Sequence, residues 1–284
     1  MAGQHTAALR AGGATGVTNP TRTDGPLLAV RDVVMRFGGV TALAGVSFEV
    51  GRRQICGLIG PNGSGKTTLF NCISGFYRPQ HGDILLEGTR LGAQPRYRMA
   101  ALGIGRTFQN LALFRSMTVR ENILTGAHPL GRTGFLAAAF ATPAVRREAA
   151  AARTRLAEVL DLLGLGEVAD RRAGALPFGT AKRVEIARAL VGRPKLLLLD
   201  EPACGLNHAE VEDLFALLHR IRAQFDLSIL IVEHHMGLVM RLCEHVVALA
   251  SGRRIADGTP EQVQRNEDVV RAYLGTPPPH ANAA

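Results

Sequence analysis

The residues best suited to chemistry in this chain form a glycine-rich loop that follows a short apolar run. Gly60, Gly65, Lys66 and Thr67 fill the pattern G-x-x-x-x-G-K-[ST], and the apolar run supplies the strand that this pattern requires. Glycines allow backbone N–H groups to converge on an anion at the start of a helix. Lys66 could then neutralise the β- and γ-phosphates of a nucleotide, while the Thr67 hydroxyl could hold Mg²⁺. The alternative is a plain glycine turn between strand and helix, but chance matches lack this flanking pattern. We call residues 60–68 the P-loop.

Two acidic residues follow a second apolar run, the four consecutive leucines at 196–199. A strand without polar residues must be covered on both faces, as in a central parallel sheet. Proteins of the α/β class bind ligands where such strands end. Asp200 therefore fits an acid that binds Mg²⁺ through water, and Glu201 fits a base that orients and activates an attacking water. The alternative for Asp200 is a helix cap or a turn former.

Two further side chains are candidates for the same site. Residues 228–232 predict another buried strand, and His234 just beyond it could donate a hydrogen bond to charge that develops near the γ-phosphate. A lone histidine is more often an ordinary surface or core residue. Phe37 precedes two glycines upstream of the P-loop and could stack on an adenine ring. The alternative for Phe37 is a core aromatic beside a turn.

The composition narrows the class of protein. With 284 residues the chain can form one large domain or two small ones, and its apolar runs fall far short of the roughly 20 residues of a membrane span. We therefore expect that it does not cross a bilayer by itself. Its four cysteines show no C-x-x-C spacing and its N-terminus has no apolar signal-peptide core, which favours reduced thiols in the cytosol. The net charge of +9 comes from scattered arginines, which favours nucleotide or anionic lipid over nucleic acid.

The remaining sequence predicts an α/β fold. Alternating apolar residues predict antiparallel edge strands at 27–34 and 46–50, and another short strand follows at 82–88. The stretch 122–172 is rich in Ala, Arg, Glu and Leu and predicts helices, with Pro143 among the residues that interrupt it. One predicted helix buries a face made of Leu156, Val159, Leu160 and Leu163. Further helices are expected from Thr180, from a capping box at 207–210, and from another helix start at 259–262.

Together these residues resemble the ATP-binding-cassette (ABC) ATPases, with five motifs in the family's order between Leu27 and Gly275. The resemblance implies an α/β P-loop NTPase (RecA-like) core with an antiparallel β-subdomain and an inserted α-helical subdomain. The expected ABC ATPase domain extends over 26–275, with disordered tails at 1–25 and 276–284. Within the domain, the core and the β-subdomain occupy 26–109 and 176–275, and the helical subdomain occupies about 110–175.

The resemblance also implies a role for each site residue. Phe37 matches the aromatic that stacks on adenine, and Gln109 matches the Q-loop glutamine that senses Mg²⁺ and the partner membrane domain. Asp200 matches the Walker B acid, Glu201 the catalytic carboxylate and His234 the switch histidine. The catalytic residues would be Lys66, Gln109, Glu201 and His234. The residues around Mg²⁺ would be Thr67, Gln109 and Asp200. The P-loop residues that bind ATP would be Gly60, Pro61, Asn62, Gly63, Ser64, Gly65, Lys66, Thr67 and Thr68.

The signature loop departs from the family pattern. Where the family usually has L-S-G-G-Q, this chain has Leu-Pro-Phe-Gly-Thr at 176–180, so the serine that contacts γ-phosphate is missing. The Gly179 amide and the helix N-terminus remain to meet an anion. In this family the signature acts in trans, on the nucleotide of the opposite subunit. One composite site is therefore expected to be weaker than the other. Asn207 also stands where the D-loop of the family more often has Asp.

Within the family, several short motifs are similar to the LivG-type subunits of branched-chain amino-acid importers. They are Arg-Phe-Gly-Gly at 36–39, Gly-Phe-Tyr at 75–77, Arg-Thr-Phe-Gln at 106–109, Val-Glu-His at 232–234 and Ala-Tyr-Leu-Gly at 272–275. This similarity implies a nucleotide-sandwich dimer with a second, LivF-type ATPase, two permease subunits and, indirectly, a solute-binding protein. It places the chain at the cytoplasmic face of the membrane, with ATP and Mg²⁺ and without nucleic acid. The solute itself is not encoded here.

Other functions remain open at this point. The ATPase of a lipid or lipopolysaccharide exporter has similar length but more often keeps the serine-glycine signature. Non-transport ABC proteins usually carry a coiled-coil insertion or two cassettes in one chain. A regulatory module without catalysis would not need the intact lysine, acids and histidine. Leu111, Phe114 and Met117 either line a groove for a permease helix or belong to the core of the helical subdomain.

Overall fold

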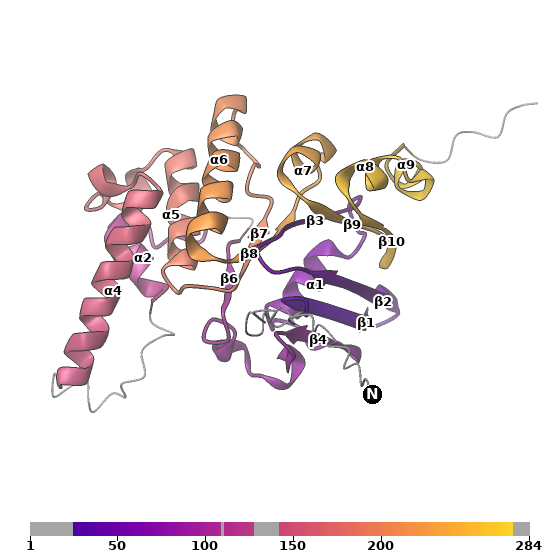
Figure 1. Ribbon diagram of the computed structural model, residues 1–284, viewed down its shortest axis with the longest axis horizontal. Coiled ribbons are helices and arrows are strands. Elements are labelled where there is room, and N and C mark those ends of the chain that lie inside the picture. Colours follow the sequence, from indigo (N-terminus) through magenta and orange to yellow (C-terminus); the bar gives the residue numbers. More distant parts are fainter. Residues whose placement is uncertain (1–24, 109–110, 128–141, 275–284) are drawn as a thin grey trace, which may run out of the picture.

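The computed structural model describes residues 25–108, 111–127 and 142–274 (Figure 1). Gln109 and both predicted tails, apart from Gly25, lie outside these residues. The described chain contains two sheets, with helices packed on the faces of the larger one. The α/β fold class and the two kinds of sheet predicted from the sequence are confirmed.

The smaller sheet is antiparallel and has the strand order β2-β1-β4-β5. Its strands are β1 (Leu28–Phe37), β2 (Val40–Val50), β4 (His81–Leu86) and β5 (Thr89–Arg90). The predicted strands at 27–34, 46–50 and 82–88 are all present. Strand β2 begins earlier than predicted because irregular pairing with β1, which shifts register at Val33 and at Met35, hides the alternation there.

The larger sheet has the order β10-β9-β3-β8-β7-β6, and its five strands other than β10 pair in parallel. Its strands are β3 (Ile55–Ile59), β6 (Ile104–Arg106), β7 (Leu196–Asp200), β8 (Ser228–Val232), β9 (His245–Ala250) and β10 (Arg253–Gly258). All five residues of β3, of β7 and of β8 are buried, as predicted for central strands. Parallel neighbours end at one edge, so the residues after these three strands are brought together there.

Helices cover both faces of the larger sheet (Figure 1). They are α1 (Lys66–Ile73), α2 (Val119–Thr125), α4 (Pro143–Leu162), α5 (Phe178–Leu190), α6 (His208–Phe225), α7 (Met236–Leu242), α8 (Pro260–Gln264) and α9 (Glu267–Leu274). Short 3₁₀ helices occur at Leu91–Ala93, Arg96–Arg98, Gly166–Val168 and Ala173–Ala175. The predicted capping box at Asn207 and helix start at Thr259 are both present, and Thr118 caps α2 in the same way.

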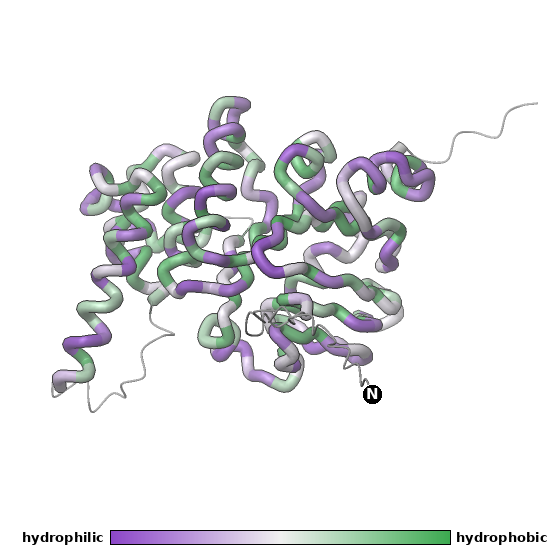
Figure 2. The backbone as a smooth tube through the Cα atoms, viewed as in Figure 1, coloured by the Kyte–Doolittle hydropathy of each residue, from purple (hydrophilic) through white to green (hydrophobic). Residues whose placement is uncertain are grey.

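The hydrophobic core lies on the two faces of this sheet. Leu198 and Leu230 pack with α1 and the smaller sheet, whereas Leu197 and Ile229 pack with the helices on the opposite side. Figure 2 shows hydrophobic residues along these strands and alternating character along the outer helices. The predicted apolar face of α4 at 156–163 is buried, so this prediction is also confirmed. Within the described residues, no helix combines the length and apolar character needed to cross a membrane.

The helix after the signature loop begins earlier than predicted. The sequence indicates a start at Thr180, but α5 begins at Phe178. The N–H of Ala181 donates to the carbonyl oxygen of Pro177, which closes the first turn and leaves Gly179 inside it. Proline fixes its own φ and can precede a first turn without a side-chain cap, which the apolar pattern did not reveal.

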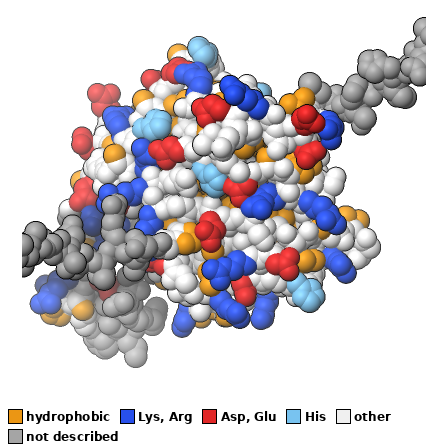
Figure 3. Space-filling view, turned by 45° about the vertical axis from the view of Figure 1, so that its right-hand side comes forward, with side chains coloured by type: hydrophobic (Ala, Val, Ile, Leu, Met, Phe, Trp, Pro, Cys, Tyr) orange, Lys and Arg blue, Asp and Glu red, His pale blue; other side chains and the backbone are white. Residues whose placement is uncertain are grey.

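The surface carries mixed charge. Figure 3 shows Lys and Arg side chains interspersed with Asp and Glu over the face in view. Exposed ion pairs such as Arg52 with Glu87 (2.7 Å) and Arg241 with Glu212 (2.6 Å) join opposite charges. On this face the basic side chains do not gather into the continuous stripe that a nucleic acid would require.

We predict that Gly126→Ala destabilises the fold. Gly126 ends α2, and a Cβ there would overlap the carbonyl oxygen of Arg188 on α5. The two helices would have to separate, at a cost of about 1–3 kcal/mol in the free energy of unfolding. Urea denaturation measures this cost, and Gly166→Ala is the matched control because its Cβ would meet no atom within 4 Å. Equal stability of the two variants would contradict the prediction.

Candidate functional site

The P-loop joins β3 to α1 and is fixed by close backbone packing. A Cβ at Gly60 would overlap the carbonyl oxygen of Leu249 on β9. A Cβ at Gly65 would lie 2.6 Å from the carbonyl oxygen of Ala42 on β2. Both glycines also have positive φ, +150° and +104°. Only glycine fits at these two positions, so strands from both sheets hold the loop in place.

Lys66 opens α1, and its side chain turns back over the P-loop. Its Nζ donates to the carbonyl oxygens of Gly60 (2.6 Å) and Pro61 (2.9 Å). Lys66 is only 7% exposed, and this burial lowers the pKa of its ammonium group. The negative charges of Glu201 and then Asp200 oppose that shift. The structure therefore brings the P-loop lysine and both predicted acids into one site.

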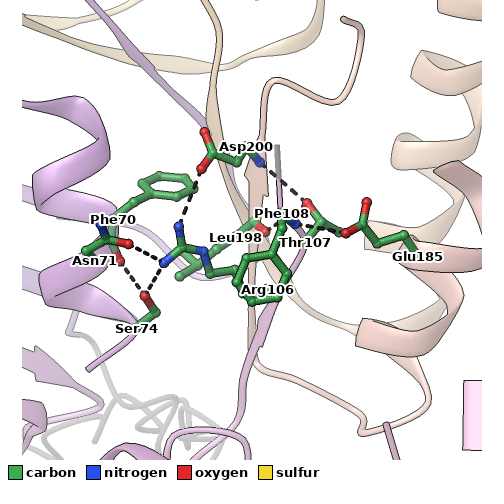
Figure 4. A network of polar contacts seen from close by, with 9 residues as sticks. All are labelled: Phe70, Asn71, Ser74, Arg106, Thr107, Phe108, Glu185, Leu198 and Asp200. Carbon is green, nitrogen blue, oxygen red and sulfur yellow. Dashed lines mark hydrogen bonds and ion pairs between the residues drawn. The ribbon is translucent and has the colours of Figure 1, made fainter. Parts of the chain in front are cut away.

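Asp200 ends β7 and faces Arg106, which ends β6 (Figure 4). Nη2 of Arg106 lies 3.4 Å from Oδ2 of Asp200, and both side chains are almost fully buried. Nη1 of Arg106 also donates to Oδ1 of Asn71 (2.8 Å) and to Oγ of Ser74 (2.5 Å), at the end of α1. Burial raises the pKa of the Asp200 carboxyl, and the charge of Arg106 opposes this rise. Arg106 thus favours the ionised form of Asp200 and ties it to α1.

Glu201 and His234 lie next to one another where β7 and β8 end. Glu201 has φ of +45°, a left-handed conformation that is uncommon outside glycine and concentrated at functional sites. Its Oε1 lies 3.7 Å from Nδ1 of His234. The buried carboxylate of Glu233 accepts the N–H of Ala203 at 3.1 Å. The turns that follow the two strands are therefore bound to each other.

Of the predicted site residues outside the P-loop, three are not among these contacts. Phe37 ends β1 and is 43% exposed, with its ring edge-on to Tyr77 at 5.2 Å between centroids, so the alternative of a core aromatic is wrong. Gly179 lies in the first turn of α5, where a Cβ would stand 2.7 Å from Oε1 of Glu210. Gln109 lies outside the described residues.

Helix α5 holds the chain on both sides of Gln109. The carboxylate of Glu185, 1% exposed, accepts the N–H of Phe108 at 3.0 Å (Figure 4). Nη1 of Arg188 donates to the carbonyl oxygen of Ala112 at 2.5 Å. Burial raises the pKa of the Glu185 carboxyl, against the hydrogen bond from Phe108. The segment that carries Gln109 is therefore tied to the helix that starts at the signature loop.

Residues 43–204, more than half of the chain, match the family described as ABC transporter. The chain belongs to this family. Residues 253–277 of this ABC subunit match a second family, described as branched-chain amino acid ATP-binding cassette transporter. The fold and the cassette family expected from the sequence are therefore confirmed: the chain is an ATP-binding subunit of the kind whose ATPase activity is coupled to transport.

Curated relatives of this ABC subunit include transport proteins of two kinds. It is 46% identical over 250 residues to the high-affinity branched-chain amino acid transport ATP-binding protein BraF of Pseudomonas aeruginosa, which covers 88% of this chain and 98% of BraF. The identity and both coverages are the same for LivG of Salmonella typhimurium. The lipopolysaccharide export system ATP-binding protein LptB of Haemophilus influenzae is 34% identical, with 88% and 97% covered.

Solved cassettes share the same fold. The ATP-binding cassette MJ1267 in its ADP conformation superposes with a TM-score of 0.75 at 31% identity, covering 89% of this chain and all of MJ1267. The subunit cbiO1 from Clostridium perfringens, part of the transporter complex cbiONQ, gives a TM-score of 0.73 at 29% identity, with 87% and 93% covered. The fold of this ABC subunit is therefore that of known nucleotide-binding cassettes.

Arg106, Glu185 and Glu233 organise the site, although no sequence motif predicts a chemical role for them. The side chains of all three are almost fully buried in the structure, and for Glu185 the sequence carries a signal. Glu185 stands between Val184 and Ile186, both buried. A charge at such a position requires a partner, although the sequence does not show which group supplies it.

We predict that Arg106→Met destabilises this subunit by about 3 kcal/mol, because it leaves the buried Asp200 carboxylate without its cation. The pKa of Asp200, already raised above 3.8, should rise further. Because the pKa of Asp200 is raised in the folded protein, the folded state binds this proton more tightly than the unfolded state does, and protonation stabilises the fold. This stabilisation is complete below pH 3.8 and is lost as pH rises through the folded pKa. Urea unfolding should therefore show a larger loss at pH 8 than at pH 5.

The control is the double variant that combines Arg106→Met with Asp200→Asn. It removes the carboxylate, so the pH dependence of the loss should disappear and part of the stability should return. A loss that is the same at both pH values, or unchanged in the double variant, would show that Arg106 acts through packing alone.

Proposed function

We propose that this ABC subunit hydrolyses MgATP to power the uptake of branched-chain amino acids, or of related hydrophobic amino acids or small amides, through partner permeases. The supporting observation is the combination of the site at the strand edge, which brings Lys66, Asp200, Glu201 and His234 together, with the relatives BraF and LivG. Their identity of 46% extends over nearly their whole length, and residues 253–277 add the match to a branched-chain family.

The P-loop would bind the triphosphate. Backbone N–H groups from Gly60 to Thr68 would surround the phosphates, and Lys66 would exchange its present carbonyl partners for β- and γ-phosphate oxygens. Phe37, exposed at the end of β1, would stack on the adenine ring. These roles require the loop shape that Gly60 and Gly65 permit.

The site also offers the oxygen donors that Mg²⁺ prefers, namely the Thr67 hydroxyl and the Asp200 carboxylate, with Gln109 as the third residue of the set. When bound, the ion would neutralise charge on the phosphates. Arg106 would keep Asp200 ionised for this task. The fit is supported by the site itself, since the negative charges of Glu201 and Asp200 act on the buried lysine of the P-loop.

Glu201 would act on water, and His234 on the γ-phosphate. The carboxylate of Glu201 can accept a proton from the attacking water and orient it. His234, 3.7 Å from that carboxylate, can donate a hydrogen bond to charge that develops on the phosphate oxygens. The hydrogen bond from the N–H of Ala203 to Glu233 would keep Glu201 and His234 next to one another.

We infer a second, LivF-type ATPase subunit as the partner across the nucleotides. The signature loop at 176–180 would reach the nucleotide of that partner through the N–H of Gly179 and the start of α5. Because the loop lacks the usual serine and Glu210 stands close to Gly179, this composite site would be the weaker of two. Closure of the dimer would be passed on as a rigid-body movement.

A groove beside the Gln109 segment would receive a helix of a permease. It is lined by side chains from the end of β6, from the segment after Gln109 and from α5, including Phe108, Phe114 and Arg188. Phe114 and Met117 are 52% and 37% exposed, so they are not core residues, and Leu111 is half-buried. This arrangement would place the subunit at the cytoplasmic face of the membrane, with two permeases and indirectly a solute-binding protein.

Lipopolysaccharide export is the second candidate, and its support is the relative LptB. The identity of 34% to LptB is lower than the 46% to BraF, and the family matched at 253–277 is described by branched-chain amino acids. The deciding experiment is uptake into proteoliposomes that contain this subunit and its permeases. ATP-dependent accumulation of labelled leucine, isoleucine or valine supports the proposal, and ATPase activity that no loaded binding protein stimulates would refute it.

Glu201→Gln should abolish turnover, with a loss of at least about 100-fold in kcat, because the variant keeps the shape of the side chain but cannot take a proton. ATP binding should stay within a few-fold of the wild type. Phosphate release by the reconstituted complex and nucleotide binding by the full chain measure the two effects. Lys66→Ala is the comparison variant, which should lose both. A Glu201→Gln subunit that retains a tenth of the wild-type rate would contradict the role of Glu201.

Gly179→Asp should impair turnover less than Glu201→Gln does. The substitution sets a carboxylate at the start of α5 and against Glu210, which disturbs the composite site that uses this loop but leaves the other one intact. Phosphate release by the complex gives the rates, and thermal unfolding of the variant checks that the subunit is folded. Equal and complete loss in both variants would argue against two unequal sites, as would full activity from a homodimer of this chain.

A further inference from the structure

The C-terminal helix α9 contacts the P-loop directly. Tyr273, near its end, is half-buried, and its hydroxyl oxygen accepts the N–H of Gly60 at 2.8 Å. Val269 on the same helix is 1% exposed and packs in the core on the helical side of the larger sheet. The helix is therefore anchored independently of the loop, and Tyr273 can transmit that anchorage to Gly60.

The N–H of Gly60 depends on this contact. Gly60 is buried and lies one residue beyond β3, whose last paired residues are Leu58 with Val232 and Ile59 with Ala248. A buried backbone donor without an acceptor is costly, and here the side chain of Tyr273 supplies the acceptor. Burial raises the pKa of the Tyr273 phenol, so the acceptor stays a neutral hydroxyl at physiological pH.

Both backbone polar groups of Gly60 form hydrogen bonds with side chains. Its N–H donates to Tyr273, and its carbonyl oxygen accepts from Nζ of Lys66 at 2.6 Å. A second contact from the C-terminal region supports the same loop, since the N–H of Gly252 donates to the carbonyl oxygen of Ser64 at 3.0 Å. The residues that follow β9 thus hold both the first turn of the P-loop and its middle.

We propose that Tyr273 is a positioning residue for nucleotide binding, which fixes the P-loop in its binding shape through the N–H of Gly60. This proposal rests on the proposed function, because it assumes that the P-loop binds MgATP. Tyr273 lies within residues 253–277 and outside the general cassette match at 43–204. The contact is therefore a link between the C-terminal segment of this subunit and the phosphate site common to cassettes.

Loss of the Tyr273 hydroxyl changes the fraction of the protein whose P-loop has the binding shape. It does not change the groups that contact the nucleotide. Without the acceptor, conformations in which the first turn opens become less costly, so a smaller fraction of the protein is ready to bind. Apparent affinity falls by that fraction, whereas the bound state, once formed, keeps its lysine and its acids. The effect should appear in binding and in KM, while kcat stays near the wild-type value.

The test compares Tyr273→Phe with Tyr97→Phe in the full chain. Both remove one hydroxyl, but Tyr97 is 77% exposed on a 3₁₀ helix. Titration calorimetry with MgADP should show about 5-fold weaker binding for Tyr273→Phe and no change for Tyr97→Phe. In the reconstituted complex, KM for ATP should rise by a similar factor with kcat within 2-fold. Binding by Tyr273→Phe within 2-fold of the wild type, or a loss in kcat at constant KM, would overturn the proposal.

Amide exchange gives a second measurement, which can be made on the wild-type protein and on Tyr273→Phe. By NMR, the N–H of Gly60 should be protected from exchange, and in Tyr273→Phe it should exchange at least 5-fold faster. A Gly60 N–H that exchanges freely in the wild type would also overturn the proposal. Should the wild-type chain fail to bind MgADP at all, the proposed function fails; should it bind normally and Tyr273→Phe match it, only the role of Tyr273 fails.

Discussion

Parallel pairing of β3, β8 and β7 is the constraint on which the site depends. Because neighbouring parallel strands end at the same edge of a sheet, three separate stretches of sequence deliver their next residues to one place. The P-loop follows β3, Glu201 follows β7 and His234 follows β8. Each of these strands is buried along its whole length, so none can slide without exposing its apolar residues. The burial of hydrophobic strands thus fixes the positions of the polar groups at this edge.

The polar groups at this edge are buried at a cost in stability. Lys66, Asp200 and Glu185 all have pKa values shifted by burial toward the neutral form. Partners from other elements offset part of this cost: Arg106 for Asp200, the N–H of Phe108 for Glu185, and loop carbonyls for Lys66. The positive φ of Glu201 adds backbone strain at the same edge. Such a concentration of unfavourable terms is typical of a site maintained for chemistry.

The sequence predicts well those features that depend on local pattern. Buried strands such as 196–199, the P-loop and the capping box at Asn207 can be read directly, because apolar runs, glycine spacing and capping residues act within a few positions. The long-range contacts could not be predicted. The partners of Arg106 lie at Asn71, Ser74 and Asp200, and no local rule relates these positions. The start of β2 at Val40 could not be predicted for a similar reason, since its irregular register is set by the strand beside it.

Helix α5 joins two regions that serve different partners in the proposed function. Its first turn contains Gly179. About two turns later, Glu185 and Arg188 form hydrogen bonds with the chain on either side of Gln109. Since an α-helix rises about 1.5 Å per residue, the two regions lie only about 10 Å apart on one stiff rod. They are therefore one mechanical unit. In a hybrid cassette, the segment 106–112 therefore cannot be exchanged alone. A graft that leaves out position 185 would transfer this segment without the carboxylate that binds the N–H of Phe108.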